Sequence, residues 1–171
     1  MRIETKRLHL HPLTPNQLLK YIYNDHSLET NLGVEPCDRV ISEDLRAALS
    51  ETILPNVLDT TKNIYFCTMW TIIHKEKNCL VGDLCFVGEP DYYGRVELGY
   101  GTYDQHQGNG YMTEAVGALI SWAFLQPDVK SVVASTDKTN VPSFRVLENN
   151  GFQRYDETEE LYYWQAMNCK L

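Results

Sequence analysis

The chain has 171 residues, of which 43% are hydrophobic and 22% charged, and no linker or repeat divides it, so we expect one globular domain over residues 1–171. The formal net charge of −8 argues against a protein that binds nucleic acid or an anionic membrane, because such proteins need an excess of Lys and Arg. No apolar run reaches the roughly 18 residues of a membrane span, and no signal peptide is apparent, so a cytoplasmic protein is expected.

The N-terminal part predicts one strand followed by a helix. Residues 3–13 alternate apolar and polar side chains, which favours a strand. Thr14 and Gln17 then form a capping-box pattern around Pro15, which predicts a helix to about Asn24.

The next segments predict a loop, a helix and three strands. Residues 27–42 carry Gly and Pro and are expected to be a loop, and Ser42 can cap a helix that ends near Ile53, before Pro55. Strand patterns joined by short turns follow at 64–74, 80–87 and 96–103. Their short connections make these three strands antiparallel neighbours.

The strongest helical signal begins after residue 110 and ends before Pro127. One apolar stripe at the helical period consists of Met112, Ala115, Val116, Leu119, Ile120 and Ala123. A strand at 130–136 follows, and the strand–helix–strand order makes it parallel to the strand at 96–103. A helix at 140–149, capped by Gly151, and further sheet segments at 151–152 and 161–167 complete an α/β fold.

A glycine loop at the start of this helix is the main candidate binding site. Gly108 and Gly110 lack side chains, so an anion can approach the free amides of the helix N-terminus. Residues 96–129 contain no Lys or Arg, so backbone amides would hold that anion. Thr113 replaces the third glycine of the dinucleotide fingerprint and no Gly-Lys-Ser/Thr follows, which excludes the two usual nucleotide loops.

Two motifs together resemble one family. Residues 96–115, Val-Glu-Leu-Gly-Tyr-Gly-Thr-Tyr-Asp-Gln-His-Gln-Gly-Asn-Gly-Tyr-Met-Thr-Glu-Ala, are similar to the acetyl-CoA-binding segment of the GNAT superfamily, in its RimJ/RimL-like branch. Residues 140–152, with Asn140, Ser143, Arg145 and a closing Gly-Phe, resemble the second motif of that family, and 4–8 resembles its start. The resemblance implies a single-domain mixed sheet with antiparallel N-terminal strands and a splayed parallel pair at the cofactor site, flanked by helices.

The resemblance also implies which residues bind acetyl-CoA. The pantetheine arm would pair with backbone groups of Gly101, Thr102 and Tyr103. The pyrophosphate would lie on the amides of Gln107, Gly108, Asn109, Gly110, Tyr111 and Met112. Asn140, Ser143 and Arg145 would lie near the cofactor, and Arg145 and Lys138 are the nearby cations that could reach a phosphate.

The sequence specifies the catalytic residues less fully than the cofactor-binding residues. Glu97 is the candidate base, acting through water, and its alternative is a strand-edge carboxylate paired with Arg95 or a similar cation. Many relatives place a Tyr acid where this chain has Leu147, so Ser143 becomes the nearest hydroxyl that could protonate the thiolate. Tyr100 and Tyr103 are further candidates for the acid, and a thiolate can also leave without one.

The expected reaction is transfer of an acetyl group from acetyl-CoA to a primary amine, with a protein or peptide N-terminus as one acceptor. A polyamine or amino sugar is the alternative acceptor, and a non-catalytic acyl-CoA-binding domain is the alternative class. The acceptor should contact residues 14–55 and 88–94. We expect no metal, because His9 and His11 lack suitable partners, and a homodimer is compatible with the family.

Overall fold

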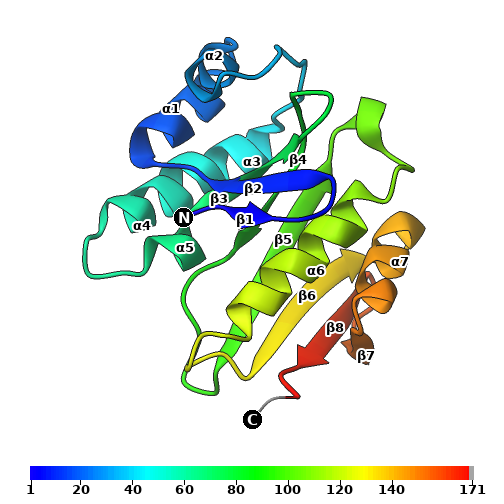
Figure 1. Cartoon of the computed structure of the whole chain (residues 1–171). Helices are drawn as coiled ribbons and strands as arrows, with labels where there is room; N and C mark the ends of the chain where they lie inside the picture. Colours follow the sequence, from blue (N-terminus) through cyan, green and yellow to red (C-terminus); the bar gives the residue numbers. More distant parts are fainter. Residues whose placement is uncertain (170–171) are drawn as a thin grey trace.

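A computed structural model describes residues 1–169, which form one eight-stranded sheet with helices on both faces (Figure 1). The strand order is β1-β2-β3-β4-β5-β6-β8-β7. The strands are β1 (Ile3–Glu4), β2 (Leu8–Pro12), β3 (Met69–His74), β4 (Cys79–Phe86), β5 (Arg95–Thr102), β6 (Ser131–Asp137), β7 (Gln153–Glu157) and β8 (Leu161–Met167). The α/β class with a mixed sheet is therefore confirmed.

The helices divide between the two faces of the sheet. They are α1 (Pro15–Tyr23), α2 (Ser27–Leu32), α3 (Glu43–Ala48), the π-helical turn η1 (Leu49–Ile53), α4 (Leu54–Leu58), α5 (Ile64–Cys67), the 3-10 turn η2 (Asp104–His106), α6 (Tyr111–Ala123) and α7 (Val141–Asn149). The stripe of α6 is buried against one face, while a second core joins α1, α2, η1 and α4 to the other. No helix within the described range is long and apolar enough to cross a membrane.

The parallel pair β5–β6 diverges along its length. Only residues 95–97 of β5 pair with residues 131–133 of β6, although β5 continues to Thr102 and β6 to Asp137. Beyond the paired residues β6 stays bonded to β8 over its whole length, while β5 stays bonded to β4. The predicted splayed pair is confirmed, and among residues 1–169 the divergence leaves one edge of β5 without a strand partner beyond residue 97.

The N-terminal strand was predicted as one segment and is in fact a hairpin. Residues 5–7 turn the chain, so that β1 pairs with β2 and Ile3 lies opposite Leu10. The amide of Thr5 donates to the carbonyl of Leu8 and closes the turn. Alternation of apolar and polar side chains is the same in one strand and in two, so the pattern could not reveal the turn.

Two expectations about residues 27–55 were wrong. Residues 27–32 form the short helix α2 rather than a loop, and six residues are too few for a helical period to be visible. The helix that starts at Glu43 does not end before Pro55 but continues through η1 into α4. Pro55 lies in the first turn of α4, directly after the π-helical turn, which accommodates a residue without an amide hydrogen.

Three other boundaries differ from the prediction. Residues 64–67 form helix α5, capped by the side chain of Asn63, and the strand begins only at Met69. Helix α6 ends at Ala123, well before Pro127, and the penultimate strand covers 153–157 instead of 151–152. Aromatic and β-branched residues favoured a strand at 64–67, and the local cap decided against it.

Candidate active site

The glycine loop connects η2 to the N-terminus of α6. Gly108 and Gly110 have φ values of +74° and +73°, the left-handed conformation that glycine adopts without steric cost. Gly110 is the N-cap of α6, and no side chain caps the helix. Residues 107–110 are exposed, and a Cβ at Gly108 would meet nothing within 4 Å. The loop therefore leaves open space and free amides at the positive end of a 13-residue helix, which fits a phosphate group.

Side chains of the loop hold its shape. The side-chain Nδ2 of Asn109 donates to the carbonyls of His106 and Gln107, at 3.0 and 2.9 Å. The side-chain Nε2 of Gln107 donates to the carboxylate of Asp104 at 3.0 Å. Met112 is 4% exposed and packs in the core, as the apolar stripe predicted. Its size therefore does not obstruct the loop.

Arg7 places a cation beside the loop, which the prediction missed. Its Nη1 donates to the carbonyl of Asn109 at 3.0 Å, and its Nε lies 2.6 Å from a carboxylate oxygen of Glu114. Its guanidinium covers the ring of Tyr111 at 4.8 Å, and its Nη2 would lie 3.6 Å from a Cβ on Gly110. The absence of Lys and Arg from 96–129 therefore does not make the loop free of cations, because the β1–β2 turn supplies one.

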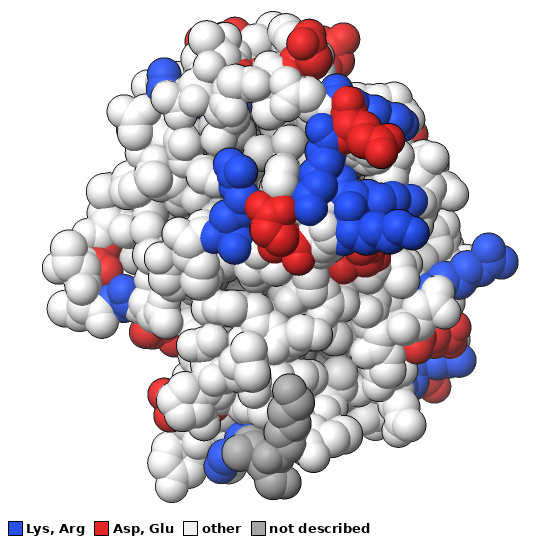
Figure 2. All heavy atoms as spheres, viewed as in Figure 1, with Lys and Arg blue, Asp and Glu red and all other residues white. Residues whose placement is uncertain are grey.

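Basic side chains gather on this face of an otherwise acidic protein. Figure 2 shows Lys and Arg concentrated near the β1–β2 hairpin and the N-terminal end of α6, with acidic side chains among them. Lys77 lies 5.5 Å from the ring of Tyr111, and Lys75 pairs with Glu4 at 2.9 Å. Arg7 and Lys75 are each paired with a carboxylate, so the patch near the loop carries both charges.

The open edge of β5 faces the gap left by β6. The amide of Tyr103 donates to Val81 of β4, and the carbonyl of Glu97 accepts from Val87 of β4. Because the backbone groups of alternate residues point to opposite sides of a strand, those of Gly101 also point toward β4 and those of Thr102 point into the gap. Of the three residues expected to pair with pantetheine, Thr102 has the suitable orientation, and the amide of Tyr103 is already bonded.

Tyr100 and Ser143 meet across this gap. The hydroxyl of Tyr100 donates to the carbonyl of Ser143 at 3.1 Å, and burial raises the pKa of Tyr100 to about 12. The side chain of Asn140 accepts from the amide of Ser143 and caps α7. Leu147 is fully buried in the core, so its position on α7 faces inward and offers no group to the gap.

The remaining predicted residues are separate from these contacts. Glu97 is exposed, and no cation lies within salt-bridge distance of it in the part of the chain that the structure describes. The alternative pairing with Arg95 is not observed, because Arg95 binds Asp91 at 2.9 Å. Arg145 is exposed on α7, whereas Lys138 pairs with Glu157 at 3.0 Å.

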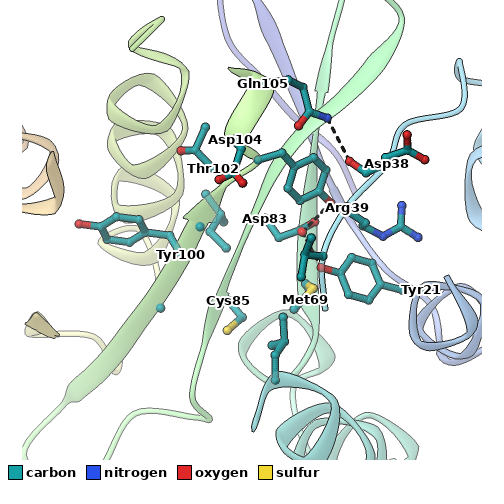
Figure 3. Close-up of a pocket in the computed structure, with 16 residues that line it drawn as sticks. Tyr21, Asp38, Arg39, Met69, Asp83, Cys85, Tyr100, Thr102, Asp104 and Gln105 are labelled. Carbon is teal, nitrogen blue, oxygen red and sulfur yellow. Dashed lines mark hydrogen bonds between the residues drawn. The ribbon is translucent and has the colours of Figure 1, made fainter. Parts of the chain in front are cut away.

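A pocket of about 360 Å³ lies beside β4 and β5, between these strands and residues 21–45 (Figure 3). The hydroxyls of Tyr21 and Tyr103 both donate to one oxygen of Asp83, each at 2.7 Å. Arg39, also on the pocket wall, binds Glu29 at 2.5 Å. The pocket includes part of the expected acceptor segment 14–55 and none of 88–94. The residues that line the pocket are distant in sequence, so no local sequence pattern predicted it.

Comparisons with known proteins decide the family. A model of the acetyltransferase (GNAT) domain matches residues 7–153. The chain is also 30% identical over 165 residues to the uncharacterized N-acetyltransferase YjdG of Bacillus subtilis (strain 168), a match that covers 95% of each protein. The chain belongs to the GNAT acetyltransferase family. It is accordingly an N-acetyltransferase, and members of this family use acetyl-CoA as the acyl donor.

Solved GNAT structures share the fold at low sequence identity. The ribosomal-protein-S5-alanine acetyltransferase of Vibrio fischeri has a TM-score of 0.73 at 15% identity, and the match covers 99% of this chain and 97% of that one. RimL, a ribosomal L7/L12 α-N-protein acetyltransferase solved in complex with coenzyme A, has a TM-score of 0.69 at 18% identity over 98% of both chains. No group of three or more potential metal ligands occurs among residues 1–169.

Proposed function

We propose that this GNAT protein transfers an acetyl group from acetyl-CoA to a primary amine and that the loop 107–112 binds the CoA pyrophosphate. The observation that carries the proposal is the loop itself. Two left-handed glycines expose the amides at the start of α6, directly beside the edge of β5 that has no strand partner. A phosphate on the loop and an extended arm along the open edge would satisfy both sets of backbone groups.

The proposed cofactor contacts extend on both sides of the loop. Amides of Gly108 to Met112 would face the pyrophosphate, with Arg7 as an additional cation, whereas the backbone amide of Gln107 already donates to the carbonyl of Asp104 at 3.3 Å. Thr102 would pair with pantetheine through its backbone, and Gly101 and Tyr103 would shape the adjoining wall. Asn140, Ser143 and Arg145 would border the cofactor from α7, where Arg145 is free to reach a phosphate.

The chemistry requires a neutral amine, a polarised carbonyl and a proton for the leaving thiolate. Acetyl-CoA supplies the thioester. Glu97 would accept the proton of the amine through a water molecule, a role that its exposure and lack of a cationic partner permit. Backbone amides at the open edge of β5 would polarise the carbonyl. Ser143 is the proposed proton source, and Tyr100 is its neighbour and alternative.

The acceptor stays a choice between two classes of amine. A protein or peptide N-terminus is the first candidate, because structural neighbours are named as ribosomal-protein acetyltransferases. A polyamine or amino sugar is the second, and the small pocket beside Asp83 favours it. A cytoplasmic location and a homodimer stay predictions.

Release of free thiol from acetyl-CoA in the presence of an amine panel tests the proposal. We expect turnover that depends on the amine, with peptides, polyamines and amino sugars tested side by side. Turnover with peptides alone would support the first class of acceptor, and turnover with small amines alone the second. A thermal shift with CoA but no thiol release with any amine would contradict the proposed enzyme and favour the binding domain.

A further inference from the structure

The pocket beside Asp83 contains a buried charge that its neighbours do not balance. Asp83 is 6% exposed, and Tyr21 and Tyr103 donate to only one of its two oxygens. The other oxygen, Oδ1, is buried and has no hydrogen-bond partner among residues 1–169. An ionised carboxylate in such a place is unfavourable unless a cation compensates it.

Arg39 does not supply that compensation by itself. Its Nη1 binds Glu29, and its guanidinium lies 4.7 Å from the centre of the ring of Tyr21. The side chains of Arg39 and Glu29 are each 1% exposed, so this pair is neutral and buried. The three charges of Glu29, Arg39 and ionised Asp83 therefore sum to one negative charge at the pocket wall.

The rest of the lining indicates the chemistry of the missing cation. Acidic side chains Asp38 and Asp104 lie at the pocket, and no Lys of the described range 1–169 lines it. Apolar surface comes from Val40, Leu45, Met69, Leu84 and Cys85. A volume near 360 Å³ is at the small end of ligand pockets, which span about 300–1,000 Å³. The lining suits an aliphatic stem that ends in a positive charge.

The pocket also adjoins the proposed reaction site. Gly99 and Gly101 of β5 line it, and Gly101 lies opposite Asp83 in the β4–β5 ladder. A Cβ at Gly101 would meet nothing within 4 Å, so this part of the wall is open. Figure 3 shows the side chain of Tyr100 across β5 from Asp83 and directed away from it. Only the β5 backbone therefore separates Asp83 from the gap proposed for the thioester.

We propose that this pocket binds the acceptor as an alkylammonium ion and that Asp83 is the anion that selects it. This inference rests on the proposed function in taking the acceptor to be an amine. It adds that the acceptor carries an aliphatic stem and a positive charge on binding, and that neutral or anionic analogues are rejected. The amine would lose its proton only after docking, on its way to the thioester.

Protonation of Asp83 gives a second prediction, which concerns how the affinity for the amine depends on pH. Burial raises the pKa of Asp83, although hydrogen bonds from Tyr103 and Tyr21 and the charge of Arg39 oppose the rise. When the pH falls through this raised pKa, the carboxylate is protonated and its attraction for an ammonium ion is lost. Affinity for the amine should therefore decrease on acidification.

Calorimetric binding to the protein saturated with CoA tests the inference without any turnover. The probes are n-pentylamine, n-pentanol and pentanoate. We expect the wild-type protein to bind only the amine and Asp83→Asn to bind it at least tenfold more weakly, with unchanged affinity for CoA. Asp128→Asn is the matched control, because Asp128 is exposed and outside this pocket, and it should retain the amine affinity within twofold.

The outcomes separate the two proposals. Equal amine affinity in wild type and Asp83→Asn, or equal binding of pentylamine and pentanol, would overturn the ammonium site. Amine binding that depends on Asp83 without acetyl transfer would instead overturn the proposed enzyme alone. If Asp83→Asn does not fold, Tyr103→Phe serves, since it removes one hydrogen bond that lowers the pKa of Asp83. The loss of amine affinity should then begin at a higher pH, and an unshifted profile would overturn the inference.

Discussion

Glu97 and Asp83 are carboxylates on neighbouring strands in different surroundings. Glu97 is exposed near the point where β5 leaves β6, whereas Asp83 is buried among tyrosine hydroxyls. Their surroundings fit two different tasks. A solvated carboxylate can exchange protons through water, and a buried one can hold a cation.

Substitution Glu97→Gln tests the proposed base. General bases contribute about 10²–10⁴-fold to rates, so kcat should fall by at least about 100-fold while KM for acetyl-CoA stays unchanged. Steady-state thiol release measures both. A kcat within twofold of wild type would show that Glu97 is not the base.

A carboxylate on α6 ties that helix to the N-terminal hairpin. Glu114 accepts hydrogen bonds from the hydroxyl of Thr5 and the backbone amide of Arg7, and it pairs with the guanidinium of Arg7. Burial raises the pKa of Glu114, but these contacts outweigh burial and leave the pKa below its ordinary value of 4.5. The ionised form is therefore favoured by folding.

Glu114→Gln should lower the free energy of unfolding by about 1–3 kcal/mol at pH 7, because polar partners lose a charged acceptor. The folded pKa is depressed, so this stabilisation is present above the unfolded pKa and is lost as the pH falls through the folded pKa. The difference between the proteins should thus shrink below about pH 4, as measured by urea unfolding. Glu148→Gln, an exposed change on α7, is the control, and a difference independent of pH would contradict the assignment.

The β4–β5 ladder and α6 approach each other closely at Gly82. A Cβ there would lie 2.5 Å from the carbonyl oxygen of Gly101 and 3.2 Å from the end of Met112. Gly82→Ala should therefore cost about 1–3 kcal/mol of unfolding free energy through overpacking. Gly99→Ala is the matched strand control, since its Cβ would meet only the sulfur of Cys85 at an ordinary 3.7 Å. Equal effects of both changes on chemical unfolding would refute the close approach.

Over the whole molecule, strong local signals predicted the fold well. The capping box of Thr14 and Gln17 makes both of its expected bonds, and the stripe of α6 lies in the core. Strand–helix–strand order predicted the parallel pair correctly. Short elements were missed where local propensity competes with a cap or turn, as in α2, α5 and the β1–β2 turn.

The candidate site likewise contains residues that the sequence predicted and residues that it missed. Contiguous motifs indicated the loop and α7, because the residues of each act through one backbone segment. Arg7 and Asp83 were missed, because long-range pairing brings them to their positions. Arg7 reaches Asn109 only through packing of the N-terminal hairpin on α6. Asp83 meets Tyr103 when β4 pairs with β5, and it meets Tyr21 when α1 packs on the sheet.

Affinity for CoA in the Gly110→Glu protein is the most direct test of the proposed cofactor site. The substitution places bulk and negative charge where the pyrophosphate is proposed to lie, and Gly33→Glu makes the same change at another exposed left-handed glycine. By isothermal calorimetry we expect wild type and Gly33→Glu to bind CoA alike, and Gly110→Glu to bind at least about 100-fold more weakly, a loss near 2.7 kcal/mol. Unchanged affinity in Gly110→Glu would contradict the assignment of the loop.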